Sequence, residues 1–580
     1  MILFIMTKQW SQTFVLLVIV VLTALFVRLI SIDTAPYGAH IDEASLGYNA
    51  FSVAQTGKDE YGKTLPLIFQ AYGDQKLPAY IYSIAPLTYF FGLSNLAVRL
   101  PGAIAGSLFV VFVYLLLKQL KFSDGVSLLG ALVAATSPWG IMLSRVFGYE
   151  SGFGLLFFTI GVWSFLEARN SRHAWKLIVM SAIAFALTWY SYIAYRVITP
   201  IMIFILVAMF MRSGKFITRQ AMLFLLIFFI SIAPLMVLSR SGTGTARIGQ
   251  AVHASMQGVV MTIDDDRSIC AKSLPRFLCY INSNKIKSYA MTMLNGYAEV
   301  FAPPYLFVKG DVDDEYVNVA GYGLLSFAVL PWYLLGCIYL GSRLITRSVN
   351  RFEVFVILGL LITPLPTLIF GVLQKVRLSG LFPFIIITCM YGIQYFLGMI
   401  RITWQRRFIL LLSGVIILLS TGFFMVDFLA IHVQKYEITF QTPIAKLMKY
   451  LGAQDKNLPT YVRSINEAVV LYAYYNAVDP AYFQNNVTRP PADSGGFSHA
   501  TDLGNLHRTD MNIDEIYCKS LNAPHFLYAT NADLMKEGLV EKPKHIIYSR
   551  DKVHELYYIY DSGDIITKGI DCEYLTRDNP

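Results

Sequence analysis

The feature that most constrains this chain is a series of apolar stretches, each about 20 residues long, between residues 12 and 430. A helix of that length spans the hydrocarbon core of a bilayer and satisfies its own backbone polar groups. We therefore predict a polytopic α-helical membrane protein with about eleven transmembrane helices. The predicted spans lie near residues 12–32, 99–117, 125–143, 151–168, 174–194, 197–211, 220–238, 320–341, 353–373, 378–398 and 407–430.

Composition excludes the main alternative, a soluble protein of several domains. Hydrophobic residues make up 55% of the chain and charged residues only 15%, whereas an average soluble domain has roughly 25% charged residues. A soluble chain of this length would have too little polar surface to cover its apolar side chains. Arg28 and Leu29 follow the first apolar stretch without a small-residue cleavage site, which favours a retained anchor over a signal peptide.

Basic residues in alternate short connections predict the orientation. The positive-inside rule makes the side that carries them cytoplasmic. With an odd number of spans, the N-terminus is cytoplasmic and the C-terminus extracytoplasmic, in a multi-pass protein of the plasma (inner) membrane. The net charge of +9 then reflects topology and contact with anionic membrane lipids, so we expect no nucleic-acid partner. The basic residues are Lys8, Lys118, Lys121, Arg169, Arg172, Lys176, Arg212, Lys215, Arg219, Arg343, Arg347, Arg351, Arg401, Arg406 and Arg407.

Three long segments fall on the predicted outer side: residues 33–98, 240–319 and 431–580. We assign the first two as outer loops of a transmembrane domain at 1–430. In the third, apolar strings at 468–472 and 545–548 alternate with polar helical stretches, which predicts an α/β extracytoplasmic domain. A G-x-x-x-x-G-K-[ST] nucleotide loop is absent from the sequence, so the chemistry is expected at the outer face rather than in a cytoplasmic ATPase.

The cysteines agree with an extracytoplasmic location of these segments. Cys270 and Cys279 lie in the second outer segment, and Cys518 and Cys572 lie in the third. Each segment thus contains one potential pair, and an oxidising compartment favours disulfides. The alternative is four free thiols.

The first outer segment contains the acidic pair Asp42-Glu43 directly before a helical pattern at 43–56 that Gly57 would end. This pattern predicts Asp42 at the N-cap and Glu43 in the first turn, where both would stabilise the helix. An ionised carboxylate near the membrane surface is also a candidate base. The two interpretations are compatible.

A second helix is expected after Lys76-Leu77-Pro78, because proline suits the first turn of a helix. Its apolar, aromatic sequence is interrupted by Pro86 and is too short to span the bilayer, so it is expected to lie in the interface. Lys76 would then reach headgroup depth, where an ammonium group can bind a phosphate. The alternative is a surface lysine that extends towards water.

Several motifs occur in one order along the chain: Asp42-Glu43, Lys76-Leu-Pro-Ala-Tyr, Val98-Arg99-Leu100-Pro101, Ser137-Pro138-Trp139 with Ser144-Arg145, and the segment 295–311. In the order of these motifs the chain resembles the protein O-mannosyltransferase and aminoarabinose-transferase group of the C superfamily of membrane glycosyltransferases. Within that group the motifs resemble more closely those of bacterial relatives of unassigned substrate. The resemblance covers about residues 33–400.

The resemblance implies a glycosyltransferase that takes a sugar from a polyprenyl-phosphate donor at the outer membrane face, without a nucleotide or organic cofactor. A divalent-metal requirement stays open. The family's loop aspartate corresponds to Asp42, as base, and we predict that Glu43 beside it is also catalytic. The family's loop lysine corresponds to Lys76, as a ligand of the lipid phosphate. The family's second acid, in a later outer loop, corresponds by position to Glu150.

Other charged and aromatic residues lie at predicted outer turns. Arg145 and Glu150 would bind phosphate and sugar hydroxyls, or form a surface ion pair. Tyr192 and Arg196 would contact sugar and phosphate, or belong to an interfacial aromatic belt. Arg377, with Lys375 close by, would bind the anionic carrier or be solvated. The run Asp264-Asp265-Asp266 lacks an EF-hand pattern, so no metal site is expected there.

These observations favour a single displacement in which an acceptor hydroxyl, on a protein, lipid or glycan, attacks the anomeric carbon of the donor while Asp42 takes the proton. One alternative is a transporter or flippase of a polyprenyl-linked sugar, for which mid-span charges and internal repeats are expected. The other is a non-catalytic envelope assembly protein. That protein would not need acids and bases in several separate outer loops.

Overall fold

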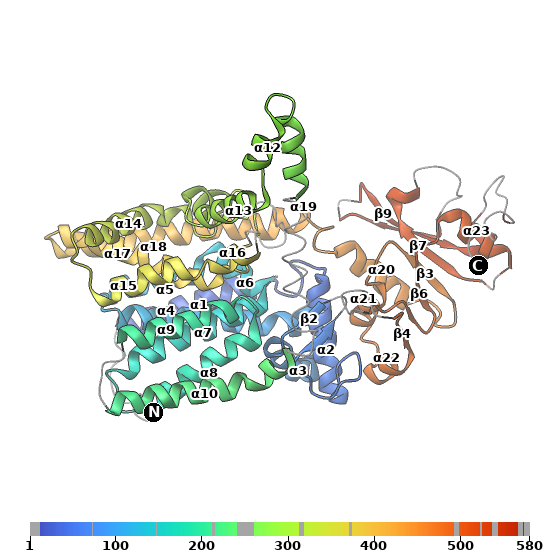
Figure 1. Cartoon of the computed structure of the whole chain (residues 1–580). Coiled ribbons are helices and arrows are strands. Elements are labelled where there is room, and N and C mark those ends of the chain that lie inside the picture. The colour runs from blue at the N-terminus through green and yellow to red at the C-terminus, as the bar shows by residue number, and fades with distance from the viewer. Residues whose placement is uncertain are drawn as a thin grey trace. The chain divides into compact units, whose positions relative to one another are not determined.

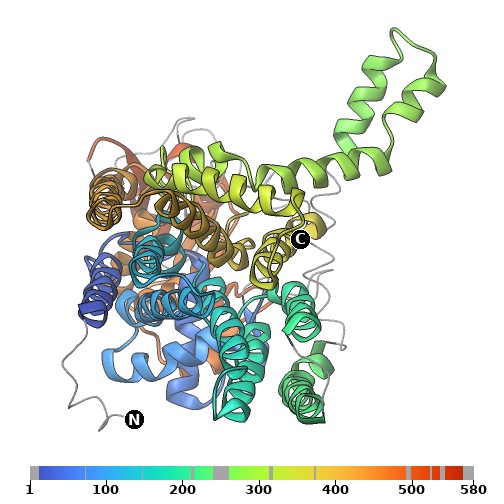
Figure 2. The same cartoon turned by 90° about the vertical axis from the view of Figure 1, so that its left-hand side faces the viewer.

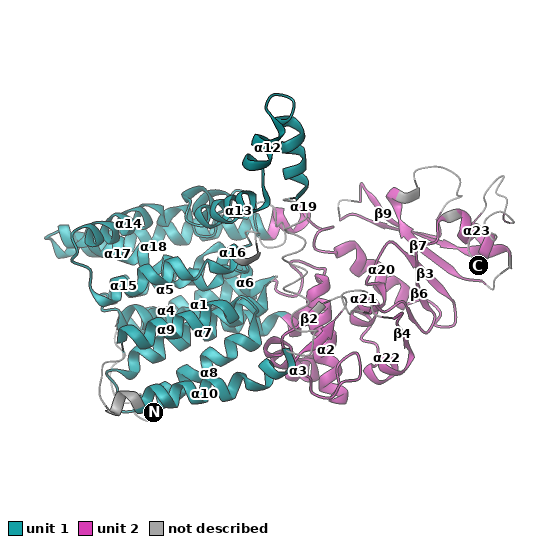
Figure 3. Cartoon of the chain, in the orientation of Figure 1, with its two compact units in different colours: residues 1–30, 99–428 teal, residues 31–98, 429–580 magenta. Residues whose placement is uncertain are grey.

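The computed structural model describes residues 12–71, 74–146, 148–210, 215–239, 260–311, 318–370, 374–491, 498–522, 525–535, 543–550, 552–565 and 572. Lys8, Arg212 and residues 240–259 of the predicted second outer segment lie outside these ranges. The chain divides into two compact units, which Figure 3 shows in different colours. Unit 1 comprises residues 1–30 and 99–428, and unit 2 comprises residues 31–98 and 429–580.

Unit 1 is a bundle of long apolar helices (Figure 1). Its elements are α1 (Gln12–Leu29), α4 (Asn95–Gln119), α5 (Asp124–Thr136), α6 (Pro138–Arg145), α7 (Tyr149–Ala168), α8 (Ala174–Ser191), α9 (Tyr195–Phe210), α10 (Lys215–Ser239), α12 (Arg276–Asn282), α13 (Lys285–Glu299), η1 (Tyr305–Lys309), η2 (Phe327–Val329), α14 (Leu330–Ile345), α15 (Arg351–Ile362), α16 (Leu365–Phe370), η3 (Ser379–Leu381), α17 (Phe382–Met399), α18 (Thr403–Val426) and η4 (Asp427–His432).

Each of the eleven predicted spans coincides with helix in this bundle. Among the described residues, nine helices are long and apolar enough to cross a membrane. The pair α5–α6 makes a tenth span that is bent by 49°, and α9 is a shorter apolar helix. The bend falls at Ser137-Pro138, where proline supplies no backbone N–H and holds the preceding residue in an extended conformation.

Helix α17 forms the centre of unit 1, since every residue from 382 to 393 is buried. Helix α14 packs closely against α17 through two glycines. A Cβ atom on Gly392 would lie 1.9 Å from the Trp332 carbonyl oxygen, and one on Gly336 would lie 2.0 Å from that of Thr388. Small residues of this kind allow two membrane helices to approach closely. By contrast, α1, α10 and α18 expose many large apolar side chains, as expected of lipid-facing helices.

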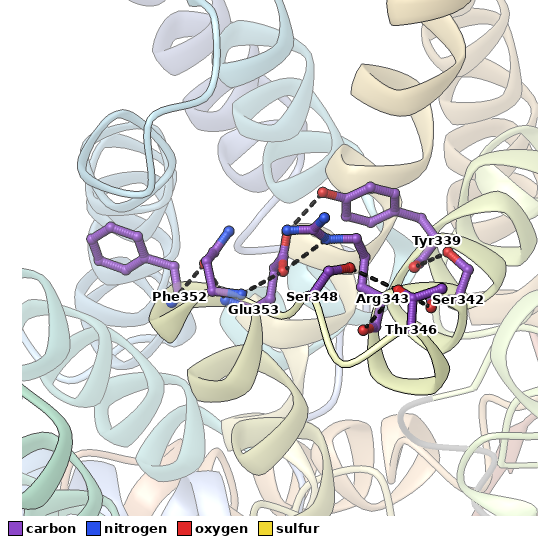
Figure 4. A network of polar contacts seen from close by, with 8 residues as sticks. Tyr339, Ser342, Arg343, Thr346, Ser348, Phe352 and Glu353 are labelled. Carbon is purple, nitrogen blue, oxygen red and sulfur yellow. Dashed lines mark hydrogen bonds and ion pairs between the residues drawn. The ribbon is translucent and has the colours of Figure 1, made fainter.

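The basic turn between α14 and α15 is organised by a buried carboxylate, shown in Figure 4. Glu353 accepts a hydrogen bond from the Tyr339 hydroxyl at 2.7 Å and pairs with Arg343 Nε at 3.3 Å. It also accepts from the Asn350 backbone N–H at 2.8 Å, which completes a capping box at the start of α15. One carboxylate therefore fixes the helix start and compensates one of the arginines of this turn.

Unit 2 joins the segment after α1 to the C-terminal residues. Its elements are α2 (Ile41–Thr56), β1 (Phe69–Ala71), β2 (Asp74–Lys76), α3 (Pro78–Phe91), α19 (Val433–Lys435), α20 (Thr442–Gly452), β3 (Thr460–Arg463), α21 (Ala468–Tyr475), α22 (Pro480–Asn486), β4 (Val487–Thr488), β5 (Asp502–Leu503), β6 (Leu506–Thr509), α23 (Ile513–Asn522), β7 (Leu527–Asn531), η5 (Ala532–Met535), β8 (His545–Tyr548), β9 (Glu555–Asp561) and η6 (Ser562–Asp564).

Among the described residues of unit 2, the main sheet has seven strands in the order β4-β5-β6-β3-β7-β9-β8. Strand β3 pairs in parallel with β6 and β7, and the remaining neighbours are antiparallel. The predicted extracytoplasmic α/β domain thus contains a mixed sheet. The apolar string at 545–548 is a strand, but the one at 468–472 begins helix α21. A short apolar run does not by itself distinguish the two structures.

By its contacts, the segment 31–98 groups with residues 429–580 in unit 2, whereas the sequence predicted it as an outer loop of the transmembrane domain. The physical reason is that α2 packs on α21 and α22 and hydrogen bonds connect the two segments. The Tyr48 hydroxyl donates to the Val478 carbonyl at 3.1 Å. The Gln484 amide donates to the Ser52 hydroxyl and to the Asp59 carbonyl, each at 3.0 Å.

Both predicted disulfides are present in the structure. Cys270–Cys279 lies in unit 1, and Cys518–Cys572 lies in unit 2.

We predict that Glu353→Ala destabilises the protein by roughly 1–3 kcal/mol, because it removes a helix cap and leaves the Tyr339 hydroxyl and Arg343 without their acceptor. Thermal unfolding in detergent measures the effect as a lower Tm. Arg351→Ala is the matched control, since this exposed residue lies on the same turn and surface substitutions usually cost less than about 0.5 kcal/mol. Equal Tm values for the two variants would show that the network contributes nothing.

Candidate active site

Helix α2 of unit 2 carries the acidic pair, but Asp42 is not its N-cap. The N-cap is His40, whose Nδ1 accepts a hydrogen bond from the Asp42 backbone N–H at 3.1 Å. Asp42 is therefore the second residue of the helix. The prediction of an Asp42 cap is wrong because the imidazole of His40 takes that role.

Glu43 provides the second hydrogen bond of the capping box at the start of α2. Its Oε2 accepts from the His40 backbone N–H at 2.9 Å, and the residue is buried. The helix ends, as predicted, at Gly57, which adopts φ = 70°. Glu43 therefore fixes the start of α2 and leaves Asp42 as the more accessible acid of the pair.

Lys76 lies directly against Asp42. The lysine ends strand β2, whose antiparallel pairing with β1 places it opposite Phe69. Its Nζ lies 2.5 Å from Asp42 Oδ1. The lysine side chain is 2% exposed and that of Asp42 19%. This burial contradicts the alternative of a surface lysine that extends into water. As predicted, α3 begins at Pro78 just after it.

The pair combines a buried cation with a partly open carboxylate. An ammonium next to a carboxylate favours the ionised form, which is the form that accepts a proton. His40 Nδ1 lies 3.4 Å from Asp42 Oδ2, so both carboxylate oxygens have a neighbouring nitrogen. The arrangement holds a partly exposed carboxylate between two nitrogen-bearing side chains.

Unit 2 also contains a buried acidic pair, Asp59-Glu60, in the turn after α2. Glu60 is 1% exposed, and its Oε2 has no hydrogen-bond partner among the described residues. Burial raises the pKa of the Glu60 carboxyl to about 7, and Arg489 only partly opposes the rise. The Arg489 guanidinium lies 4.0 Å from the ring centroid of Tyr61 and donates to the Glu60 carbonyl at 3.2 Å. Burial likewise raises the pKa of Asp59.

In unit 1, hydroxyl groups join three of the predicted outer turns. Ser151 donates to the Val376 carbonyl at 2.6 Å and lies 2.7 Å from the Ser379 hydroxyl. The Tyr195 hydroxyl lies 2.8 Å from the same Ser379 oxygen. The network thereby brings together the backbone segments that carry four of the predicted binding residues. These residues are Glu150 in the first turn of α7, Tyr192 and Arg196 around the start of α9, and Arg377 before η3.

Lys375 is buried in the same region rather than solvated. Its backbone N–H donates to Asp311 Oδ2 at 3.1 Å, and its Nζ donates to Asn318 Oδ1 at 3.3 Å. Its carbonyl accepts from the Trp139 indole at 3.1 Å. Asp311 and Asn318 were not predicted as site residues, although Asp311 ends the 295–311 motif. Arg196 and Arg377 are half-buried.

Arg145 is fully buried, so the alternative of a surface ion pair with Glu150 is wrong for its guanidinium. Its Nη1 donates to the carbonyls of Val27 and Arg28 at 3.1 and 3.0 Å, and its Nη2 donates to that of Ile30. The guanidinium also lies 5.3 Å from the Phe428 ring centroid. Arg145 therefore caps the C-terminal end of α1, where carbonyl groups lack helical partners.

Arg28 is a second buried arginine, which was predicted only to lie at the end of the first apolar stretch. Its Nη1 donates to the carbonyls of Ala24 and Ala135 at 3.1 and 2.8 Å, and its Nε donates to the Ser144 hydroxyl at 2.8 Å. It thus ties α1 to both halves of the bent span.

The candidate residues therefore form two groups, one in each unit. Unit 2 holds the Asp42–Lys76 pair with Glu43 as its structural support. Unit 1 holds the turns that carry Glu150, Tyr192, Arg196, Lys375 and Arg377.

A known protein family matches part of the chain. Residues 75–237, from the residue before Lys76 into α10, match the protein family described as dolichyl-phosphate-mannose-protein mannosyltransferase. The resemblance to the protein O-mannosyltransferase group of membrane glycosyltransferases is confirmed over these residues. No curated protein sequence matches the chain.

Solved structures share the fold of most of the chain. ArnT from Cupriavidus metallidurans, solved with bound undecaprenyl phosphate, has a TM-score of 0.53 at 10% identity. The match covers 94% of this chain and 97% of the ArnT chain. The oligosaccharyltransferase of Archaeoglobus fulgidus in its apo form has a TM-score of 0.50 at 12% identity over 81% of this chain. The chain spans 64% of the length of that archaeal protein. At these identities the likeness shows a shared polytopic fold.

We predict that Glu60→Gln gains stability relative to the wild type as the pH rises. Because the folded-state pKa is raised from 4.5 to about 7, protonation of Glu60 favours folding fully below pH 4.5, and this contribution is lost as the pH rises through 7. Glutamine does not ionise, so the Tm difference between variant and wild type should grow from pH 5 to pH 7.5 and then level off. The corresponding difference in the free energy of unfolding has an upper limit of about 3 kcal/mol.

Variant and wild type are measured side by side in the same detergent at each pH, so that contributions common to both proteins cancel. A Glu60→Gln difference that does not change with pH would mean that Glu60 is already ionised at pH 5.

Proposed function

We propose that this chain transfers a sugar from a polyprenyl-phosphate donor to an acceptor hydroxyl by single displacement. The observation that carries the proposal is the Asp42–Lys76 pair, a partly open carboxylate held by a buried ammonium at 2.5 Å. The family match supports a membrane glycosyltransferase with a lipid-linked donor, and ArnT, which shares the fold, was solved with undecaprenyl phosphate.

In the proposed reaction, the acceptor oxygen attacks the anomeric carbon and the bond from that carbon to the phosphate oxygen breaks. Asp42 takes the hydroxyl proton as general base. Polyprenyl phosphate leaves as a stable anion, so no general acid is required. The acceptor hydroxyl belongs to a protein, lipid or glycan. No nucleotide or organic cofactor takes part in this scheme.

Lys76 has two consecutive roles in this scheme. Before reaction its ammonium keeps Asp42 ionised and oriented. When Asp42 becomes protonated it ceases to attract the ammonium, whose charge then stabilises the developing phosphate anion. Arg196 and Arg377, with Lys375, are assigned to the phosphate of the donor, and Tyr192 and Glu150 to its sugar. Glu43 is assigned to positioning, because it holds the helix that carries Asp42.

We place this chemistry on the extracytoplasmic side of the plasma membrane, with the N-terminus inside and the C-terminus outside. The support is the distribution of basic residues, which leaves the long segments on the other side. A transporter is less well supported, because the buried arginines Arg28 and Arg145 bind backbone carbonyls at helix ends and thus have structural roles.

We predict that Asp42→Asn lowers transfer by roughly 10²–10⁴-fold, the usual contribution of a general base, in protein that still folds. Release of polyprenyl phosphate from a donor panel measures it. Breaking a buried ion pair also destabilises the fold, so the double variant Asp42→Asn/Lys76→Gln, which removes both charges, is the control. Wild-type turnover in the double variant would reduce Asp42 to a counter-ion of Lys76. Glu43→Gln, in contrast, should lower Tm, with only a small effect on turnover per folded molecule.

For Lys76→Ala we expect kcat/KM for the donor to fall about ten- to hundredfold, as for loss of a charge-assisted contact of roughly 1.5–3 kcal/mol. Lys76→Arg should recover part of the activity, since the charge returns with a different geometry. Steady-state kinetics at varied donor and fixed acceptor measures both. Unchanged donor kinetics in the alanine variant would remove Lys76 from the reaction.

A further inference from the structure

An arm of unit 1, residues 260–299, projects sideways from the bundle, across the direction of the spans (Figures 1 and 2). It consists of a helix at 260–270, α12 and α13, and the Cys270–Cys279 disulfide links the first two. Neither the proposed transfer reaction nor the family match, which ends at residue 237, gives this arm a role.

The arm is attached and internally braced. At its base, α13 packs on α16, and the Tyr297 hydroxyl donates to the Leu361 carbonyl at 2.5 Å. Leu361 lies in the last turn of α15, and α16 completes the apolar span Arg351–Leu368, so the arm leaves the bundle beside the C-terminal part of that span. Within the arm, Arg267 Nε donates to the Ser283 carbonyl at 2.7 Å, and its guanidinium lies 4.5 Å from the Tyr280 ring centroid. The arm is therefore a built structure at the level of a span terminus.

The outer part of the arm exposes an unusual amount of apolar surface. Phe277 is 63% and Ile286 84% exposed, and no residue of α13 is buried. Along α13, Ile286, Ala290, Leu294 and Tyr297 recur at helical spacing and form one apolar stripe. Soluble surfaces rarely present contiguous patches of this kind without a partner. The large apolar residues exposed towards the tip are Ile269, Leu274, Phe277, Tyr280, Ile281 and Ile286.

The charge of the same region has one sign. Between residues 268 and 287 there are four basic residues and no acidic residue. All four are exposed: Lys272, Arg276, Lys285 and Lys287. The acidic run Asp264-Asp265-Asp266 lies before this region, and Arg267, paired with Asp264 at 3.6 Å, separates the two. Apolar and aromatic side chains combined with basic ones are typical of helices that lie in the interface of an anionic bilayer.

We propose that the arm lies on the bilayer surface beside the bundle, with its apolar side chains inserted at the boundary between headgroups and acyl chains and its basic side chains bound to anionic lipid headgroups. The arm leaves the end of a span sideways, so its apolar surface continues the lipid-facing surface of the bundle. The partner is an anionic lipid leaflet, and the contact braces the end of the bundle at which the arm is attached.

The test uses the full chain reconstituted in vesicles. A Cys337→Ala/Cys389→Ala background confines labelling to an introduced cysteine, with the disulfides left oxidised. Ile286→Cys and Asn295→Cys then receive an environment-sensitive NBD fluorophore. These positions are nine residues apart, which places them on opposite faces of α13 at about 100° per residue, and both are exposed.

We expect the label at 286 to emit at shorter wavelength and to be quenched about twofold more strongly by headgroup-proximal doxyl lipids than the label at 295. Vesicles that contain phosphatidylglycerol should strengthen this quenching relative to phosphatidylcholine alone. The variant Lys272→Gln/Arg276→Gln/Lys285→Gln/Lys287→Gln should remove that difference. Equal quenching at both positions would overturn the proposal. A label at 286 that is shielded without lipid quenching would also overturn it and would assign the face to a protein partner or a second copy.

Discussion

The architecture of unit 1 depends on the requirement that every backbone polar group in a membrane be satisfied within the protein. Continuous helices meet it by themselves, but helix ends and breaks do not. Two arginines meet it reciprocally here. Arg28 on α1 donates to the Ala135 carbonyl at the end of α5, and Arg145 on α6 donates to the carbonyls that end α1. The bent span and the first span thus cap each other, at the cost of burying two cations.

The same constraint explains why the broken span is stable. Ser137 and Trp139, on either side of Pro138, donate to the Leu324 carbonyl at 2.7 and 2.9 Å, and the Trp139 indole donates to that of Lys375. The break therefore connects three parts of the chain that are remote in sequence. Two motifs that support the resemblance to a transferase, Ser137-Pro138-Trp139 and Ser144-Arg145, stabilise the packing of the helices in this structure. The acid–base chemistry is assigned instead to Asp42 and Lys76.

Much of the fold was predictable, because apolar length and helix punctuation are local properties. The positions of all eleven spans, the end of α2 at Gly57 and the start of α3 at Pro78 follow from residues within one or two turns. What could not be predicted depends on distant partners. The burial of Arg28 requires the carbonyl of Ala135, and the burial of Glu60 requires the α22 region with Arg489. Even the N-cap of α2 was missed, since histidine is a less common cap than the adjacent aspartate.

The candidate site shows the same division between local and distant causes. Local sequence identified Asp42 and Lys76 separately, but only the β1–β2 hairpin explains how a lysine 34 residues later reaches the carboxylate. That geometry has a chemical consequence. A carboxylate next to a buried cation favours its ionised form before substrate arrives, and protonation of that carboxylate weakens its attraction to the cation. An anion formed in the same step, such as a leaving phosphate, would restore an electrostatic attraction to the cation. The ion pair therefore suits a reaction in which proton uptake and anion release occur together, as they do in the proposed displacement.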